Sequence, residues 1–359
     1  GLGDVYKRQI LENIDVHDGM AIGFYLVKGM NNLVLNCDAH DNYDGYSEGD
    51  SGNVDGFGGH ANKETSTGNI FRGCRAWNNG DDGFDLINCY ASYIIEYCWS
   101  FRNGYKPHSI ESSGGNGAGF KSGGYGMGDI KKVPNPIPQH TVRYCLAYYN
   151  RQQGFYSNHH LGGLIFENNT AYKNPSNYNM LNRKSSNEAV DVPGYGHIIK
   201  NNLSLSPRNS GGFPQHLINV DNTLSEIKNN SFAPNDLNLS ESDFESLNEQ
   251  ELMGSRKSDG SLPDINFLRL TNHANFRFSG MGCFINEEAV DYSWIQEPAI
   301  VLENGVARIV GEDSKSFNKF YVNGEEVSIE NGIVDLTSMS GELNLKAISE
   351  NGAVTTLII

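Results

Sequence analysis

The chain has 359 residues, enough for one large domain and a small one, and it is rich in glycine (41 residues) while only 38% of it is apolar. The formal net charge of −16 argues against nucleic-acid binding, because phosphate recognition requires clustered lysine and arginine. No stretch is long and apolar enough to span a membrane, so neither nucleic acid nor a membrane is an expected partner. An acidic polymer is an acceptable ligand if a bound cation bridges the two negative charges.

Residues 1–9 contain no initiator methionine and no recognisable signal peptide, and they look unrelated to the sequence that follows. We treat them as a non-native or fragmentary N-terminus and leave them out of the fold argument. Missing N-terminal sequence would also explain why this chain shows no export signal.

From residue 10 to about residue 232 a pattern recurs: an apolar residue, two further residues, Cys, one residue, Ala or Ser, two residues and Asn. The Cys position holds cysteine in four copies and asparagine in the others: Cys37, Cys74, Cys98, Cys145, Asn13, Asn169, Asn202 and Asn230. A spacing of 24 residues recurs (13 to 37, 74 to 98, 145 to 169), as in a solenoid whose turns carry inserted loops. We therefore predict an all-β fold, a parallel β-helix, over residues 10–232.

Equivalent residues of successive turns stack about 4.8 Å apart in such a fold. The cysteines would then form an internal stack of small side chains instead of disulfides. The asparagines that end the pattern would form a ladder whose amides satisfy backbone groups and one another. The ladder would contain Asn42, Asn79, Asn103, Asn150 and Asn174.

A second column consists of Gly-Phe pairs: Gly23-Phe24, Gly56-Phe57, Gly83-Phe84, Gly119-Phe120 and Gly154-Phe155. Their phenylalanines should point inward and stack, because successive side chains of a strand point to opposite faces. The residue after each phenylalanine then points outward, which makes Asp85 and Lys121 outward neighbours on adjacent turns. Core packing accounts for the Cys, Asn and Phe columns without any further role.

The remaining segments are less regular. Residues 105–139 form a long Gly- and Pro-rich loop between two turns, and such a loop often shapes a binding face. Residues 233–296 are predicted to be irregular and helical, with a short amphipathic helix over 240–252, and to cover the solenoid. Residues 297–359 alternate and contain four Asn-Gly turns, which predicts a small antiparallel β module of unknown role.

Four carboxylates, three of them within five residues, lie close to the second column: Asp55, Asp81, Asp82 and Asp85. Asp55 and Asp82 occupy the same place in an Asp-Gly-Phe sequence, so the repeat should stack them in space. Oxygen ligands of this kind suit Ca²⁺, which takes six to eight of them in irregular geometry. A solvated acidic turn is the alternative, although crowded carboxylates without a cation repel one another strongly.

Lys121 is the outward cation beside these carboxylates. It could form an ordinary surface salt bridge with Asp85, or it could act as a Brønsted base. A base must lose its proton, so the lysine pKa would have to fall, and a nearby divalent cation could lower it whereas unscreened aspartates would raise it. The residues alone leave both roles open.

Other polar residues are candidates for substrate binding. Arg183 and Lys184 could clamp a carboxylate, with ordinary solvated charges as the alternative. Tyr156 and Asn158 follow the Gly-Phe pair of the next turn and could also contact a substrate. A further group could polarise or bind substrate, although surface histidines usually do neither: His108, His159 and His160.

Several of these motifs together resemble polysaccharide lyase family 9, over roughly residues 10–285. The motifs are Val54-Asp55-Gly56-Phe57, Gly80-Asp81-Asp82-Gly83-Phe84-Asp85, Gly119-Phe120-Lys121-Ser122-Gly123-Gly124, and the stretches 154–158, 166–172 and 258–263. The resemblance implies a right-handed parallel β-helix and a calcium site at Asp55, Asp81, Asp82 and Asp85. It also implies that Lys121 is the base.

The family's reaction is β-elimination on pectic polymers, in which Ca²⁺ engages the uronate carboxylate and the base removes the proton on carbon 5. The resemblance therefore implies a bacterial pectic lyase that is secreted, at the cell surface or in the periplasm, and we expect it to be monomeric. Homogalacturonan and rhamnogalacturonan I are both possible substrates, and the sequence separates neither these nor endo from exo action.

Two other functions compete with this interpretation. A polygalacturonase-type hydrolase also uses a β-helix and paired aspartates, but the chain shows no matching Gly-His-Gly turn or Arg-X-Lys strand motif. A non-catalytic β-helical adhesin would need no outward Asp and Lys group, and calcium would then only stiffen the solenoid.

Overall fold

The computed structural model describes residues 7–46, 51–125, 133–208, 215–232, 237–284, 298–303, 306–310, 314–329, 332–337, 339, 342–350 and 352–358. Residues 1–6 of the suspected non-native segment lie outside the described part. The chain divides into two compact units, which are described separately. The first consists of Gly1–Ser242, Ser246–Arg269 and Met281–Phe284, and the second of Asp243–Glu245, Leu270–Gly280 and Ile285–Ile359.

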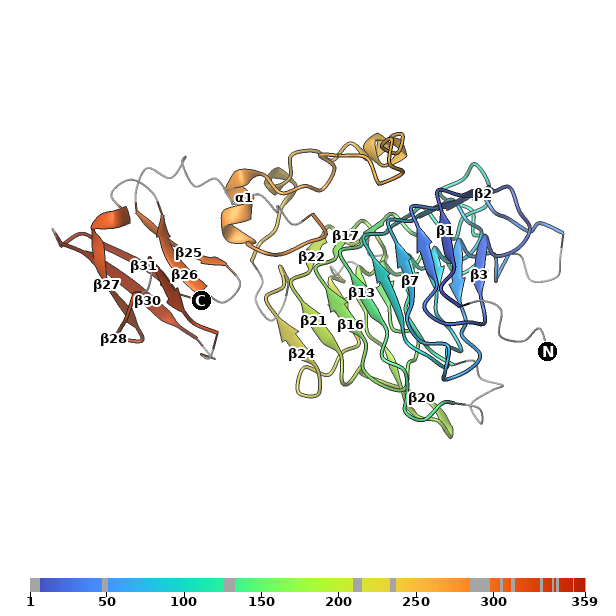
Figure 1. The fold of residues 1–359 in the computed structure, drawn as a ribbon, viewed down its shortest axis with the longest axis horizontal. Helices are drawn as coiled ribbons and strands as arrows, with labels where there is room; N and C mark the ends of the chain where they lie inside the picture. Colours follow the sequence, from blue (N-terminus) through green and yellow to red (C-terminus); the bar gives the residue numbers. More distant parts are fainter. Residues whose placement is uncertain are drawn as a thin grey trace. The chain divides into compact units, whose positions relative to one another are not determined.

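Short parallel strands of the first unit form three sheets, in which strands of successive turns lie side by side (Figure 1). The first sheet runs β1 (Ile10–Glu12), β4 (Leu33–Leu35), β7 (Asn69–Arg72), β10 (Tyr93–Glu96), β13 (Thr141–Arg143), β16 (Ile165–Glu167), β21 (Ile198–Lys200) and β24 (Glu226–Lys228). The second runs β2 (Asp15–His17), β5 (Asp38–His40), β8 (Arg75–Trp77), β11 (Trp99–Phe101), β14 (Leu146–Tyr148), β17 (Thr170–Tyr172) and β22 (Leu203–Leu205). The third runs β3 (Phe24–Leu26), β6 (Phe57–Gly59), β9 (Phe84–Asp85), β12 (Phe120–Lys121), β15 (Phe155–Tyr156), β18 (Tyr178–Asn179) and β23 (Leu217–Ile218). The predicted parallel β-helix is confirmed.

The four cysteines of the repeat, Cys37, Cys74, Cys98 and Cys145, lie at the corner between the first two sheets. The backbone turns there at one residue with positive φ, such as Asn36 (52°) or Tyr97 (53°). The next residue is the cysteine, and the Cys98 thiol donates to the carbonyl of Glu96 at 3.2 Å. All six cysteines belong to the described residues, where they are buried and free, so the prediction that they are packing residues is confirmed.

The asparagine ladder is also present. The side-chain nitrogen of each member donates to the side-chain oxygen of the next at 2.9–3.1 Å, along Asn42, Asn79, Asn103, Asn150 and Asn174. These side chains are fully buried, and their second amide hydrogens serve backbone carbonyls such as that of Ala76, 3.1 Å from Asn103. The ladder follows the strands of the second sheet and satisfies polar groups that the turn towards the third sheet removes from water.

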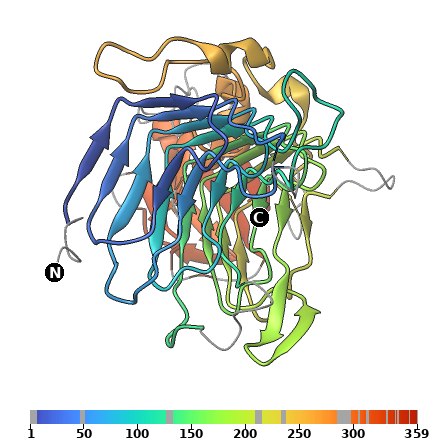
Figure 2. The ribbon, with the colours of Figure 1, turned by 90° about the vertical axis from the view of Figure 1, so that its right-hand side faces the viewer.

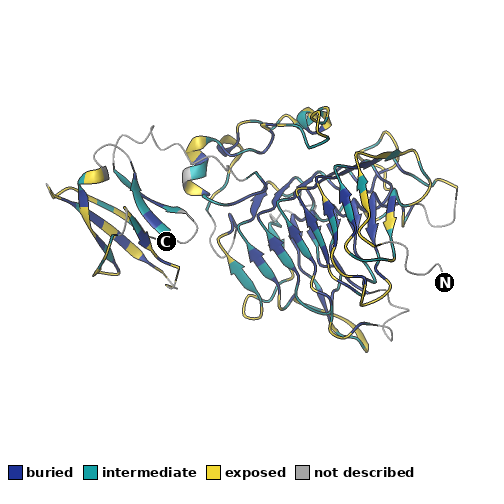
Figure 3. Ribbon diagram, viewed as in Figure 1, coloured by how far each residue is buried: buried dark blue, intermediate teal, exposed yellow. Residues whose placement is uncertain are grey.

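The aromatic column fills the interior next to the third sheet. Neighbouring rings stack with centroids 4.7–4.9 Å apart along Phe24, Phe57, Phe84, Phe120, Phe155 and Tyr178. Figure 3 shows that buried positions recur on the successive strands of the solenoid. Since the rings point inward, the residues that follow them are placed on the outer surface of the third sheet.

The segment Ser246–Arg269 of the first unit lies against the second sheet, as Figures 1 and 2 show. Arg75 on β8 donates to the carbonyls of Leu252 (3.1 Å) and Gly254 (2.8 Å). Arg256 donates to the Asp38 carboxylate on β5 at 2.5 Å. This segment covers the outer face of the second sheet, and these contacts do not involve the third sheet.

The prediction of one amphipathic helix over residues 240–252 was wrong. Two short 3₁₀ helices stand there, η2 (Glu241–Asp243) and η3 (Glu249–Met253). Between them the backbone of Phe244 pairs with Leu270, within the second unit, and that of Ser246 pairs with Phe267, within the first. These pairings hold the chain extended, and a helix cannot continue through them.

The second unit contains α1 (Asn272–Arg277) and small antiparallel sheets, as predicted for the C-terminal region. One described sheet is formed by β25 (Ala299–Glu303), β26 (Val306–Val310) and β29 (Ile333–Asp335), and the other by β28 (Glu325–Val327), β27 (Phe317–Val322), β30 (Asn344–Ser349) and β31 (Val354–Ile358). The turn at Asn323-Gly324 is present, with positive φ at both residues. Each of the other three predicted Asn-Gly turns includes residues outside the described part.

Candidate active site

The candidate site lies on the outer surface of the third sheet, where the repeat places Asp55 and Asp82 in equivalent positions. Each comes two residues before the buried phenylalanine of its turn. The intervening glycine is required for packing, because a Cβ at Gly83 would lie 2.0 Å from the Ser100 hydroxyl and 2.8 Å from the carbonyl of Gly119. The close packing of consecutive turns therefore fixes both aspartates at the same edge of the sheet.

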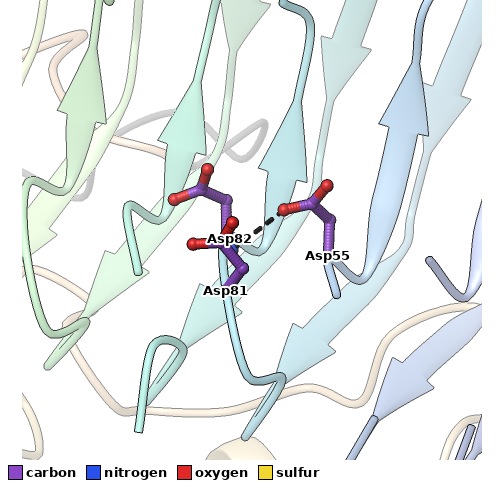
Figure 4. A group of neighbouring side chains, drawn as sticks. All are labelled: Asp55, Asp81 and Asp82. Carbon is purple, nitrogen blue, oxygen red and sulfur yellow. Dashed lines mark hydrogen bonds between the residues drawn. The ribbon is translucent and has the colours of Figure 1, made fainter. Parts of the chain in front are cut away.

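Three predicted metal ligands come together here. Carboxylate oxygens of Asp55, Asp81 and Asp82 lie within 4.8 Å of one another, and all three residues are buried (Figure 4). The backbone N–H of Asp82 also donates to Asp55 Oδ1 at 3.1 Å. Three carboxylates at this separation fit a hard cation such as Ca²⁺, which prefers oxygen ligands.

A loop orients two of these carboxylates. The amides of Asn116 and Gly117 donate to Asp81 Oδ1 at 2.5 and 3.3 Å, and the amide of Ala118 donates to Asp82 Oδ1 at 2.6 Å. Arg151 in turn donates from Nη1 to the loop carbonyls of Gly115 (2.8 Å) and Asn116 (3.1 Å). The long loop predicted to shape a binding face thus supplies backbone donors to the carboxylates.

Lys121 and Asp85 are neighbours in the register of β12 and β9, as the sequence predicted. The Lys121 ammonium lies 3.0 Å from Asp82 Oδ2 and 3.1 Å from Asp85 Oδ2, and its side chain is 12% exposed. Asp85, the fourth predicted ligand, is thus paired with the lysine and lies outside the group of three. His60, which sequence reasoning missed, lies 3.7 Å from Asp85 Oδ2.

Burial and like charge control ionisation of the carboxylates. Burial, followed by repulsion from the neighbouring carboxylates, raises the pKa of Asp55 well above its usual value. The same causes raise the pKa of Asp81 to about 7, and burial raises that of Asp82 against the attraction of Lys121. Burial also opposes ionisation of Asp85, but attraction by Lys121 and hydrogen bonding from His60 outweigh it and lower this pKa to about 2.

Lys121 responds in the opposite sense. Burial opposes its charge, but the surrounding carboxylates, Asp82 and Asp85 first, outweigh this and raise the lysine pKa well above its usual value. Without a metal ion the lysine is therefore an ammonium held in ion pairs. Both roles considered for it, salt-bridge partner and base, involve this same position.

Of the predicted substrate-binding residues, one lies beside Lys121 and others bond to backbone carbonyls. Tyr156 on β15 is the register partner of Lys121, so the structure brings it to the site. Asn158 donates to the carbonyl of Gly123 at 2.8 Å. Arg183 on β19 (Asn182–Ser185) is buried and donates to the carbonyl of Tyr125 at 2.9 Å.

The remaining candidates also have defined surroundings. Lys184 is exposed and pairs with Glu188 at 2.9 Å. His160 is buried, with Nδ1 accepting from the amide of Gly124 and Nε2 near the carbonyl of Pro138. His108 is exposed.

His159 connects the site to a residue that sequence reasoning missed. Its Nε2 is 3.0 Å from the Tyr156 hydroxyl, and its Nδ1 is 2.6 Å from Asp191 Oδ1. Asp191 lies on β20 (Glu188–Val192), which pairs with β19 in a hairpin. No repeat position marks Asp191, so the sequence offered no signal for it.

Comparison with known proteins adds to this geometry. The profile of the Pel9A-like right-handed β-helix region matches residues 4–224, and that of the rhamnogalacturonan lyase-like C-terminal region matches residues 221–356. Pectate lyase L of Dickeya chrysanthemi is 34% identical over 283 residues, which are 79% of this chain and 58% of that protein. The handedness predicted for the β-helix agrees with the first profile.

Two solved structures are also similar. A rhamnogalacturonan lyase matches with a TM-score of 0.72 and 54% identity, over 77% of this chain and 66% of that one. Pectate lyase Pel9A matches with a TM-score of 0.63 and 30% identity, over 78% and 66%. The chain thus spans less than two thirds of each of these relatives. Among the described residues, no helix has both the length and the apolar composition that a membrane span requires.

Proposed function

The chain belongs to the Pel9A-like right-handed β-helix family, and we propose that it is a calcium-dependent lyase that cleaves pectic polysaccharides by β-elimination. The observation that carries the proposal is the position of Lys121. Its ammonium lies within 3.1 Å of two carboxylates, next to a group of three buried aspartates, on the outer face of a sheet. β-Elimination on a uronate requires both a cation that binds its carboxylate and a base that removes the proton on carbon 5.

Asp55, Asp81 and Asp82 would hold the calcium ion, whereas Asp85, the fourth predicted ligand, is paired with Lys121. Bound there, the ion would neutralise the uronate carboxylate and make the proton on carbon 5 more acidic. The amides of residues 116–118 hold the carboxylates in place before any ligand arrives. Ligands fixed in advance reduce the ordering cost of binding.

Lys121 would remove the proton from carbon 5. The C5–H bond and the bond from C4 to the glycosidic oxygen break, a C4=C5 double bond forms, and the sugar beyond O4 leaves. The carboxylates that raise the lysine pKa hold it protonated in the metal-free protein, so their charge must be neutralised before Lys121 can accept a proton. The base and the cation site are therefore coupled.

Rhamnogalacturonan I is the substrate we favour. Identity is 54% with the rhamnogalacturonan lyase structure, but 30% and 34% with the two pectate lyases. The C-terminal profile that matches residues 221–356 also bears the name of rhamnogalacturonan lyase. We therefore propose that the enzyme acts on this polymer outside the cell or at its surface.

The test follows ultraviolet absorbance of the unsaturated uronate formed on rhamnogalacturonan I and on polygalacturonate, with Ca²⁺ and with a chelator. We expect a calcium-dependent rise, larger on rhamnogalacturonan I, that falls about 10³-fold in Lys121→Ala. Lys63→Ala, which removes an exposed lysine elsewhere, should keep the wild-type rate. New reducing ends without absorbance would mean hydrolysis, and no turnover on either polymer by a folded protein would favour a binding solenoid.

A further inference from the structure

Tyr156, His159 and Asp191 form a hydrogen-bonded series beside Lys121 that the elimination as described above does not use. The Tyr156 hydroxyl is 3.0 Å from His159 Nε2, and His159 Nδ1 is 2.6 Å from Asp191 Oδ1. The tyrosine is half-buried, and the side chains of His159 and Asp191 are 29% and 50% exposed. The series thus runs from the site towards solvent.

The fold places the tyrosine next to the lysine. Lys121 and Tyr156 are register partners on β12 and β15, and paired parallel strands are about 4.8 Å apart. Both side chains follow an inward phenylalanine and so project from the outer face of the sheet. A substrate that contacts the lysine therefore also lies beside the strand that carries Tyr156.

Asp191 reaches this place through an insertion. The β19–β20 hairpin interrupts the solenoid between β18 and β21, and it projects from the solenoid in Figures 1 and 2. Asp191 stands on its second strand, and its carboxylate fixes the orientation of the His159 ring by accepting from Nδ1. The ring nitrogen that remains, Nε2, is thereby directed at the tyrosine hydroxyl.

Elimination leaves a chemical requirement that Lys121 does not meet. The lysine takes a proton from carbon 5, while the departing O4 carries the electron pair of the broken bond. A sugar alkoxide is a poor leaving group at neutral pH, so a proton donor at O4 lowers the barrier. The donor has to be on the leaving-group side of the base.

We propose that Tyr156 is the general acid that protonates the leaving O4, with His159 and Asp191 as its positioning residues. This inference rests on the elimination proposed above. When His159 carries a proton on each ring nitrogen, Nδ1 donates to Asp191 and Nε2 donates to the phenolic oxygen, which leaves the phenolic proton for O4. As that proton moves to O4, the Nε2 proton replaces it on Tyr156, and solvent restores the proton of the histidine.

The ionisation of the tyrosine supports this role. Burial, followed by the negative charge of Asp191, raises the pKa of Tyr156 to about 12, against the opposing effect of Lys121. The phenol therefore keeps its proton at neutral pH and can give it only to a strongly basic acceptor. A departing alkoxide is such an acceptor.

The experiment compares two leaving groups in the full chain. One substrate is a rhamnogalacturonan I oligosaccharide, and the other is its analogue in which fluoride replaces the leaving sugar at C4 of the reacting galacturonate. Fluoride departs without protonation. We expect Tyr156→Phe to lower kcat about 10² to 10³-fold with the sugar leaving group and less than about threefold with fluoride. His159→Gln and Asp191→Asn should show the same selectivity with a smaller loss, about tenfold.

Two controls separate the possible outcomes. Lys121→Ala should lose both reactions, because both need the C5 proton removed. Tyr25→Phe removes another outward hydroxyl that lies 3.3 Å from a histidine, His60, and should leave the ratio of the two rates unchanged. Equal losses on both substrates in Tyr156→Phe, or a change in KM alone, would overturn the acid role while the elimination stands. A wild-type chain that releases neither product would overturn the elimination itself.

Discussion

Asp81 and Asp85 are separated by three residues, yet the structure displaces their pKa values in opposite directions. Asp81 faces Asp55 and Asp82, and burial together with repulsion raises its pKa to about 7. Asp85 faces the Lys121 ammonium at 3.1 Å, and its pKa falls to about 2 despite burial. In the metal-free protein, ionised Asp81 therefore lowers the free energy of unfolding, whereas ionised Asp85 raises it.

The effect of Asp81→Asn on metal-free stability should depend on pH. The folded-state pKa of Asp81, about 7, exceeds its ordinary value of 3.8, so the folded protein binds more protons than the unfolded chain between these values. The free-energy contribution of Asp81 therefore becomes less favourable as pH rises from about 4 to about 7. We expect the variant to be more stable than wild type in chelator, by at least about 1 kcal/mol more at pH 7.5 than at pH 5.

Urea unfolding at both pH values measures this difference. The buried histidines His140, His160 and His197, whose pKa values are lowered by burial, cancel because both proteins contain them. Asp85→Asn is the matched control and should destabilise the protein to the same extent at both pH values, since pH 5 already lies above 3.8. Identical behaviour of the two variants would contradict the described charge arrangement.

Arg151 should control calcium affinity without contacting the ion. It holds the carbonyls of Gly115 and Asn116, and this loop donates amides to Asp81 and Asp82. Arg151→Gln should therefore raise the calcium concentration required for half-maximal activity about tenfold, because groups behind metal ligands contribute on this scale. The rate at saturating calcium should stay within about twofold of wild type. Lys106→Gln, an exposed charge in the same long loop, should change neither quantity.

Asn103→Ala should destabilise the solenoid by about 3 kcal/mol in urea unfolding. The Asn103 oxygen accepts from the backbone and side-chain nitrogens of Asn79, at 3.1 and 3.0 Å, and its own nitrogen donates to Ala76 and Asn150. Alanine removes these four bonds and leaves the backbone N–H of Asn79 without this acceptor, whereas the Asn79 side chain keeps the Ala39 carbonyl and Asn150 Oδ1 keeps the backbone N–H of residue 103. Asn266→Ala, at an exposed position, should cost less than about 0.5 kcal/mol. A similar cost at both positions would mean that the ladder adds no stability.

The six thiols should be unreactive in the native protein. All six cysteines are buried, and burial raises the pKa of the Cys283 thiol to about 12 and that of Cys98 well above its ordinary value. A thiol reagent should therefore label none of them at neutral pH and all six after unfolding, and a reductant should leave the melting temperature unchanged. Labelling of fewer than six after unfolding without reductant would reveal a disulfide.

The interior of the solenoid and the position of Asp85 beside Lys121 could both be predicted from the repeat. A β-helix adds one strand to each sheet in every turn, so residues in the same phase of the repeat must stack. This is why the Cys, Asn and Phe columns, and the stacking of Asp55 on Asp82, could be predicted over gaps of different length. Regular stacking requires no knowledge of the loops.

The roles of the inserted loops, in contrast, depend on how the chain folds. The amides of residues 116–118, the support from Arg151 and the arrival of Asp191 at His159 depend on loop paths that have no period in the sequence. The pKa values of Asp81 and Asp85 also depend on folding. The two residues are of the same type and differ only in their burial and in the charged groups they face. Stacking is a property of the repeat, whereas ionisation and loop contacts depend on which distant groups folding brings within a few ångströms.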